Sequence, residues 1–112
     1  MPYIDVKTNA KLQDKQIEDI KAELGKAITV FPGKSETWLM CGLSQVDNMF
    51  FQGNGDVCAF VEVKLFGSVD ESASSDFTRI ICDVLAEHGI PASRVYVRYE
   101  GGTQWGWNNG NF

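Results

Sequence analysis

The chain has 112 residues, of which 44 % are hydrophobic and 22 % charged, so we expect residues 1–112 to form a single globular domain. Its formal net charge is −5 and no run of Lys or Arg occurs, which argues against a nucleic-acid partner. No apolar stretch is long enough for membrane insertion, and the first residues lack the features of a signal peptide.

Three cysteines, Cys41, Cys58 and Cys82, stand among apolar residues. An odd number cannot pair completely, and their spacing matches no metal motif, so we expect neither a metal site nor a disulfide framework. Free cysteines of this kind are typical of a reducing compartment. The chain is therefore expected in the cytoplasm.

The first half of the sequence predicts a strand, a helix and a second strand. Residues 3–8 carry β-formers, and residues 37–44 are largely apolar. Between them lies a stripe with helical spacing that Pro32 and Gly33 bring to an end; its members are Ile17, Ile20, Leu24, Ala27 or Ile28, and Phe31.

The second half repeats that order. Residues 49–51 could form a short strand before a turn, and residues 57–66 give the clearest strand of the chain. A second helix ends before Gly89 and Pro91, and its apolar stripe is Phe77, Ile80, Ile81, Val84 and Leu85. Residues 95–99 alternate as a final strand, and a tail rich in Gly and Asn follows over residues 101–112.

Two strand–helix–strand units predict an α/β (α+β) fold with both helices on one face of a shared sheet. The opposite face would then be bare. In a chain with many Val, Ile and Phe residues, we expect an oligomer to cover that face.

Pro2 is the first candidate for chemistry. Removal of Met1 would leave a secondary amine at the start of a buried strand, with an ordinary pKa of roughly 8. Burial and nearby cations lower the pKa of such an amine, and the neutral form is a competent general base. Lys34, in the loop after the first helix, could supply the cation or bind an anionic substrate, although a solvated loop lysine is the commoner case.

Tyr96 and Arg98 share one face of the last predicted strand. Arg98 could bind a carboxylate bidentately or pair with a neighbouring Asp or Glu, because a buried charge needs a partner. The aromatic residues Trp38, Trp105, Trp107 and Phe112 could wall a pocket or belong to the core or an interface. His88, the single histidine, stands near a helix end, and Gly53 and Gly55 flank a turn without the setting of a nucleotide site.

Taken in order, several motifs resemble the macrophage migration inhibitory factor and dopachrome tautomerase family over the whole chain. They are Met1-Pro2 with Thr8-Asn9, Gly33-Lys34, Met49-Phe50-Phe51, Cys58-Ala59, Gly67, Leu85-Ala86-Glu87, Arg94-Val95-Tyr96-Val97, and Gly106-Trp107-Asn108-Asn109 with Phe112. The resemblance implies two antiparallel helices on a four-stranded mixed sheet, in a homotrimer with pockets between subunits. It also implies keto–enol tautomerisation of aryl pyruvates such as phenylpyruvate, without cofactor or metal.

Residue roles follow from the same resemblance. Pro2 matches the catalytic proline, Lys34 the lysine that holds the substrate carboxylate, and Phe66 a position whose backbone N–H helps to bind it. Tyr96 matches a pocket tyrosine of the neighbouring subunit, and Arg98 an arginine of the dopachrome tautomerase branch. Pocket-lining positions are matched by Trp38, Trp105 and Phe112.

The chain departs from the family pattern at Cys58, which is followed by Ala59-Phe60-Val61, so no C-x-x-C is present and no dithiol chemistry is expected. Two other functions remain open. The first is a cytokine-like protein, secreted without a signal peptide, that binds host receptors. The second is decarboxylation or hydration of a small unsaturated acid, as in the wider amino-terminal proline superfamily.

Overall fold

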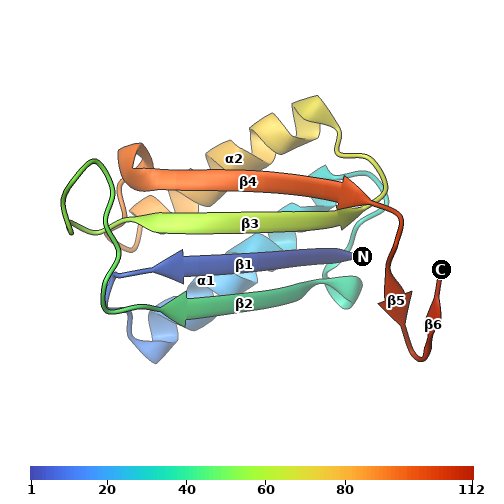
Figure 1. Cartoon of the computed structure of the whole chain (residues 1–112), viewed down its shortest axis with the longest axis horizontal. Coiled ribbons are helices and arrows are strands. Elements are labelled where there is room, and N and C mark those ends of the chain that lie inside the picture. The colour runs from blue at the N-terminus through green and yellow to red at the C-terminus, as the bar shows by residue number, and fades with distance from the viewer.

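The computed structural model describes all 112 residues and contains a four-stranded sheet with two helices on one face (Figure 1). The sheet order is β2-β1-β3-β4; β1 is parallel to β2 and antiparallel to β3, and β3 is parallel to β4. This arrangement confirms the predicted fold class. The strands and helices are β1 (Pro2–Thr8), α1 (Asp14–Ala27), β2 (Met40–Gln45), β3 (Ala59–Phe66), α2 (Glu71–Ala86) and β4 (Val95–Gly102).

Alternation along the strands determines which side chains enter the core. Every second residue of β3 (Val61, Val63, Leu65) and of β1 (Ile4, Val6) is at most 1 % exposed. Successive side chains of a strand point to opposite faces, so these aliphatic residues all lie on the helix-covered face. They pack there against the apolar stripes of the two helices, including Ile20, Leu24, Phe77, Ile81 and Leu85.

The other face of the sheet differs from the sequence-based expectation. Its residues on β1, β3 and β4 are largely charged or aromatic: Asp5, Lys7, Phe60, Glu62, Lys64, Tyr96, Arg98 and Glu100. The helices already cover the Val and Ile side chains of the central strands, so these residues do not themselves require a cover on this face. We call this charged surface the open face.

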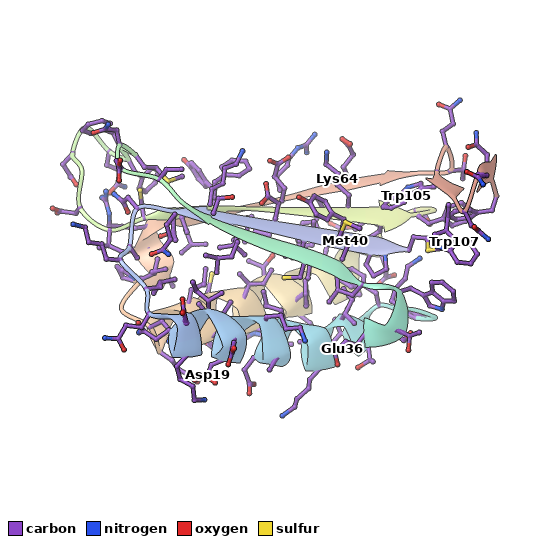
Figure 2. The ribbon with its side chains drawn as sticks, turned by 90° about the horizontal axis from the view of Figure 1, so that it is seen from below. Asp19, Glu36, Met40, Lys64, Trp105 and Trp107 are labelled. Atoms are coloured by element: carbon purple, nitrogen blue, oxygen red, sulfur yellow. The ribbon has the colours of Figure 1, made fainter.

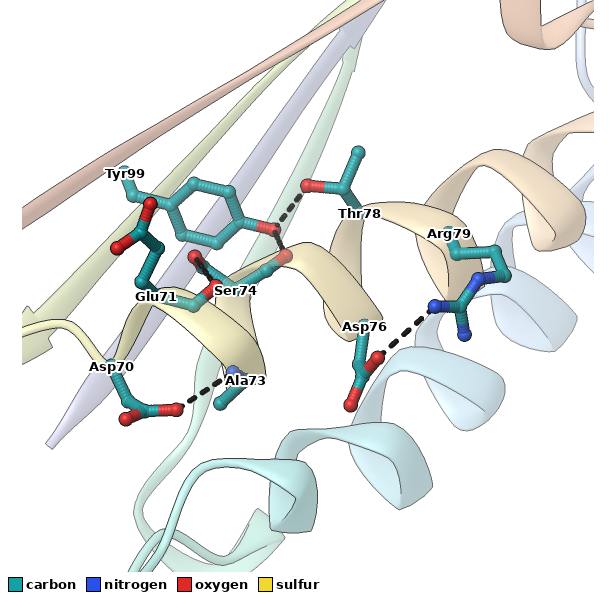
Figure 3. Close-up of polar contacts among 8 residues, drawn as sticks. All are labelled: Asp70, Glu71, Ala73, Ser74, Asp76, Thr78, Arg79 and Tyr99. Carbon is teal, nitrogen blue, oxygen red and sulfur yellow. Dashed lines mark hydrogen bonds and ion pairs between the residues drawn. The ribbon is translucent and has the colours of Figure 1, made fainter.

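Local hydrogen bonds fix the start of α2 and its packing on the sheet (Figure 3). The Asp70 carboxylate accepts from the Ala73 N–H at 2.8 Å and so satisfies one donor of the first helical turn. On β4, the Tyr99 hydroxyl donates to the Ser74 carbonyl at 2.9 Å and contacts the Thr78 hydroxyl at 2.8 Å. These contacts hold α2 against the last strand.

Several element boundaries differ from the prediction: β1 begins one residue earlier, β3 begins at Ala59 rather than at residue 57, and β4 runs to Gly102 rather than to residue 99. Three larger differences concern residues 37–44, residues 49–51 and the end of α1. Residues 37–44 were predicted as one strand, but Glu36–Trp38 form a 3₁₀ turn and β2 begins at Met40. The reason is pairing: Met40 lies opposite Tyr3, near the start of β1, so residues 37–39 have almost no strand beside them. The triplet 49–51 forms no strand, because Phe51 bridges only to Asn54 in a tight turn.

The third difference is at the end of α1, where Ile28–Val30 continue the apolar stripe as a 3₁₀ turn. The tail, which gave no prediction of regular structure, contains a small hairpin of β5 (Gly106–Trp107) and β6 (Gly110–Asn111). Asn108 and Asn109 form its turn with φ of 52° and 73°. Asn tolerates this left-handed conformation, which two-residue hairpins need.

The long connection between β2 and β3 is anchored by Arg94. Its guanidinium donates to the carbonyls of Val57, Phe51 and Asp56 at 2.9–3.1 Å and lies 5.3 Å from the centre of the Phe51 ring. Asn9 accepts from the Cys58 N–H and donates to the Met49 carbonyl from the other side.

Neither helix has the length and apolar character needed to cross a membrane. All three cysteines are free. Burial raises the pKa of the Cys41 and Cys82 thiols, so both stay protonated near neutral pH and are poor nucleophiles.

Replacing Arg94 with Met should lower the free energy of unfolding by about 2 kcal/mol, because several partly buried carbonyls lose a charged donor. Urea unfolding at fixed protein concentration measures this. Arg79→Met is the control: Arg79 is 66 % exposed in its pair with Asp76, so its loss should change stability by less than about 0.5 kcal/mol. Equal effects of the two variants would contradict the anchoring role of Arg94.

Candidate active site

The first residues of the chain are held within the sheet. Pro2 is buried and pairs with Leu65 across the antiparallel β1–β3 ladder. One residue earlier, the Met1 carbonyl accepts the Phe66 N–H at 3.0 Å. Chain termini are usually mobile. Here the start of β1 is fixed beside the end of β3.

Lys34 reaches this point from the loop after α1. The loop turns at Gly33, whose φ of 78° suits glycine. The Lys34 ammonium donates to the Phe66 carbonyl at 2.9 Å and lies 5.8 Å from the centre of the Phe66 ring. The backbone of Phe66 therefore accepts a hydrogen bond from Lys34 and donates one to Met1.

The amino terminus has the electrostatics expected of a base. Burial, followed by the positive charge of Lys34 and a hydrogen bond with its side chain, lowers the pKa of the Met1 amine below the ordinary value of 8.0. All three causes disfavour the protonated amine. A group at this position thus has a larger neutral fraction at physiological pH than a free terminus has.

A cavity of about 620 Å³ opens next to Pro2, between the open face and the C-terminal hairpin. Figure 2 shows Lys64 on the side of the sheet away from α1, with Trp105 and Trp107 at the hairpin end. The three tryptophans of the chain all line this cavity. The full lining is Met1, Pro2, Tyr3, Thr37, Trp38, Leu39, Met40, Lys64, Trp105, Gly106 and Trp107.

Aromatic contacts bring the tail to the cavity. The Trp38 and Trp107 rings meet edge to face with centres 5.2 Å apart. Phe112 packs on Phe66 with ring centres 5.3 Å apart, and its N–H donates to the Trp105 carbonyl at 3.2 Å. The last residues therefore fold back over the end of β3. An apolar, aromatic wall of this kind suits a flat ring with a polar end.

Six of the eight residues to which the family resemblance gave a site role meet at this end of the sheet. Pro2, Trp38 and Trp105 line the cavity itself. Beside it, Phe66 contacts both Lys34 and Phe112.

The remaining two, Tyr96 and Arg98, lie elsewhere in the single chain. Tyr96 pairs with Phe60, five residues along β3 from the Leu65 partner of Pro2, a separation of roughly 17 Å. It is 60 % exposed and packs on Phe51 with ring centres 5.0 Å apart. One chain therefore does not bring Tyr96 to Pro2.

Arg98 was expected to need a partner because of burial, and that premise was wrong. β4 is an edge strand, and Arg98 is exposed on its open face. It lies opposite Glu62 in the strand register but forms no ion pair. Water can solvate its charge.

Sequence reasoning did not name several lining residues as site components, among them Tyr3, Met40 and Lys64, whereas Trp107 was already a candidate for the pocket wall. Alternation could have placed Lys64 on the open face, because Val63 and Leu65 flank it. It could not have shown that this end of β3 meets the C-terminal hairpin, since no pattern in the tail predicted the hairpin. No group of three or more His, Cys, Asp or Glu side chains lies close enough together to hold a metal ion.

Comparison with known proteins places the chain in a family. The model of the family described as macrophage migration inhibitory factor (MIF) matches residues 1–110. The chain therefore belongs to the MIF family. A search of curated protein sequences found no match.

Solved structures agree with this assignment. The structure of Leishmania major MIF2 is similar with a TM-score of 0.92 and 30 % identity, over 100 % of this chain and 97 % of that one. A MIF homologue from Prochlorococcus marinus has a TM-score of 0.79 and 27 % identity, with 98 % of each chain covered. Pt0534, described as inactivated by 2-oxo-3-pentynoate, has a TM-score of 0.86 over 97 % and 94 % of the chains; its 16 % identity shows the fold alone.

Replacing Phe112 with Ala should loosen the tail over the cavity. An aromatic pair contributes about 0.5–1.5 kcal/mol, so amide hydrogen exchange in residues 105–111 should accelerate roughly three- to tenfold. Phe50→Ala is a matched control, because Phe50 is 71 % exposed and lies in the β2–β3 connection. Unchanged exchange in the tail of the Phe112 variant would show that other contacts hold it.

Proposed function

We propose that this protein is a keto–enol tautomerase of aryl pyruvates such as phenylpyruvate, with the Pro2 amine as general base once Met1 is removed. The observation that carries the proposal is the position of Met1. Its amine lies by the Lys34 side chain, and its carbonyl accepts the Phe66 N–H at 3.0 Å. Met1 thus occupies the two groups that would bind a substrate carboxylate.

Loss of Met1 changes this site in two ways. It frees the Phe66 N–H and the side of Lys34 that faces the amine, leaving two donors for an anion. It also converts the Pro2 nitrogen from an amide, which has no basicity, into a secondary amine. A base and an anion site therefore arise together, within one residue of each other.

The reaction uses these groups as follows. A 2-oxo acid places its carboxylate on Lys34 and the Phe66 N–H, with its ring in the aromatic cavity. The neutral Pro2 amine removes a proton from the carbon next to the ketone, and the positive charge of Lys34 stabilises the enolate. In the opposite direction, protonated Pro2 returns the proton to that carbon. No redox step or added reactant is needed.

The inactivator named for the Pt0534 structure is itself a 2-oxo acid, the class of substrate proposed here. The aromatic wall formed by Trp38, Trp105 and Trp107 favours an aryl group over a short aliphatic chain.

We further propose that the working unit is a homotrimer in which a neighbour supplies Tyr96 and Arg98 to the pocket. Two features support this: both side chains are exposed on the open face, and neither reaches Pro2 of its own chain. The open face also carries charges of both signs, including Asp5, Glu62 and Arg98, which suit a polar interface between subunits.

The direct test of the function is ketonisation of phenylpyruvate, followed by ultraviolet absorbance on protein shown by intact mass to lack Met1. General base catalysis contributes about 10²–10⁴-fold, so Pro2→Ala should lower the rate at least about 100-fold. Pro91→Ala, in the loop before β4, should keep the wild-type rate. No rate above buffer in the wild-type protein would reject this function and favour a receptor-binding role.

The rate should also depend on pH in a defined direction. Burial and Lys34 lower the pKa of the Met1 amine, and we expect the same two causes to act on the Pro2 amine one residue further along. The kcat/KM should then rise with pH and level off below the ordinary pKa of about 8. Lys34→Gln removes two of the three causes of this lowering, so the rising limb should move to higher pH. Lys15→Gln, which removes a lysine paired with Asp19 on the exposed side of α1, should leave the limb in place. If Lys34→Gln leaves the rising limb of the kcat/KM–pH profile in place, Lys34 does not lower the pKa of the catalytic amine.

Mixing two impaired variants tests the shared pocket. After unfolding and refolding together at equal concentration, Pro2→Ala and Tyr96→Ala subunits should recover activity. About a quarter of the pockets would then combine an intact Pro2 with an intact neighbouring Tyr96. Activity equal only to the sum of the separate variants, or a Tyr96→Ala variant of undiminished rate, would show that Tyr96 does not complete a neighbour's site.

A further inference from the structure

Lys64 is a charged residue at the cavity for which the proposed mechanism has no use. It lies on β3 two residues before Phe66, with its side chain on the open face (Figure 2). Among the residues that line the cavity, Lys64 has the only charged side chain. Lys34, the carboxylate-binding lysine of the proposed function, reaches Phe66 from the helix side and is absent from that lining.

The ammonium of Lys64 has no partner within the chain. It forms none of the four ion pairs of the structure, although its cross-strand neighbour is Glu100. It also takes part in no side-chain hydrogen bond with protein. A lysine whose stem lies along an apolar wall and whose head is unpaired can bind an anion with little rearrangement.

The surroundings of Lys64 leave room for such an anion. Lys64 and Trp105 line both the aromatic cavity and an adjoining polar groove, whose other lining residues are Leu65 and residues 100–104, with the Glu100 carboxylate among them. A substrate ring held among the tryptophans would therefore direct its far end toward this junction. The cavity of about 620 Å³ lies in the range of pockets that bury drug-sized ligands, so a substituent on the ring can be accommodated.

We propose that Lys64 is a specificity residue that binds a second carboxylate, so the preferred substrates are aryl 2-oxo acids with an acidic group on the ring. This inference rests on the proposed function for the position of the first carboxylate. Lys34 and the Phe66 N–H bind the 2-oxo acid end, and Lys64 binds the distal carboxylate on the open-face side. Two separated cations discriminate a dianion from a monoanion of the same shape.

The test compares phenylpyruvate with 4-carboxyphenylpyruvate on Met1-free protein. We expect the wild-type protein to show a kcat/KM for the dicarboxylate at least roughly tenfold above that for phenylpyruvate. Lys64→Met keeps the apolar stem and removes the charge, and it should abolish this preference. Lys15→Met is the matched control: it removes the same charge from the exposed side of α1, away from the cavity and from the open face, and should retain the wild-type ratio.

A binding measurement separates failure of this inference from failure of the proposed function. Because all three tryptophans line the cavity, quenching of their fluorescence reports ligand binding there without turnover. If neither acid is turned over but the dicarboxylate binds more tightly and Lys64→Met removes the difference, the tautomerase function fails and the role of Lys64 stands. Equal affinity or equal kcat/KM for the two acids in the wild-type protein would overturn the role of Lys64. So would an unchanged preference in Lys64→Met, or no binding of either acid.

Discussion

The central position of β1 is the constraint on which the rest of this site depends. β1 lies between β2 and β3, so both of its edges are occupied, and Ile4, Val6 and Thr8 are fully buried beneath it. Moving this strand by one residue would place Asp5 and Lys7 in the core and expose three buried side chains. The strand cannot slip, and consequently the first residues of the chain cannot move. A terminal amine thereby acquires the fixed geometry that a side-chain base usually has.

That geometry also explains how Lys34 can both lower the pKa of the terminal amine and lie beside the Phe66 N–H. The Lys34 ammonium donates to the Phe66 carbonyl, and the N–H of the same residue donates to the Met1 carbonyl. A cation, a backbone donor and the terminal amine thus occupy one small volume at the end of β3. Burial is the leading cause of the lowered pKa of the Met1 amine, because it removes water from the charged form, and the positive charge of Lys34 adds to it.

Much of the fold could be predicted from the sequence. The alternation in residues 57–66 predicts a strand, and the apolar stripe in residues 77–85 predicts a helix. Each pattern also shows which face is buried, because its apolar side chains all lie on one side. The start of β2 could not be predicted, since it depends on where β1 begins and hence on which residues have a partner. The C-terminal hairpin was missed for a related reason: Gly106, Trp107 and Gly110 give no alternation, and their positions depend on packing against Trp38 and Phe66.

The candidate site was predictable only in part, and the limits are physical. Pro2 and Lys34 could be named because few residue types supply an amine base or a cation, and their family resemblance indicated which ones. Lys64 looked like one more exposed lysine until β3, β1 and the tail were assembled around it. Tyr96 and Arg98 show a further limit: Tyr96 lies at the far end of the sheet from its own Pro2 and Arg98 lies midway along β4, so one chain alone does not show whether either belongs to a pocket.

The central claim is that Met1 occupies the anion site and that its removal opens it. It is tested most directly by titrating phenylpyruvate, with tryptophan fluorescence as the readout, into Met1-free and Met1-retaining forms of the same protein. The account predicts that the Met1-free form binds at least roughly tenfold more tightly, because the Phe66 N–H and Lys34 become available to the carboxylate. Equal dissociation constants for the two forms would show that the substrate binds elsewhere and would contradict the account.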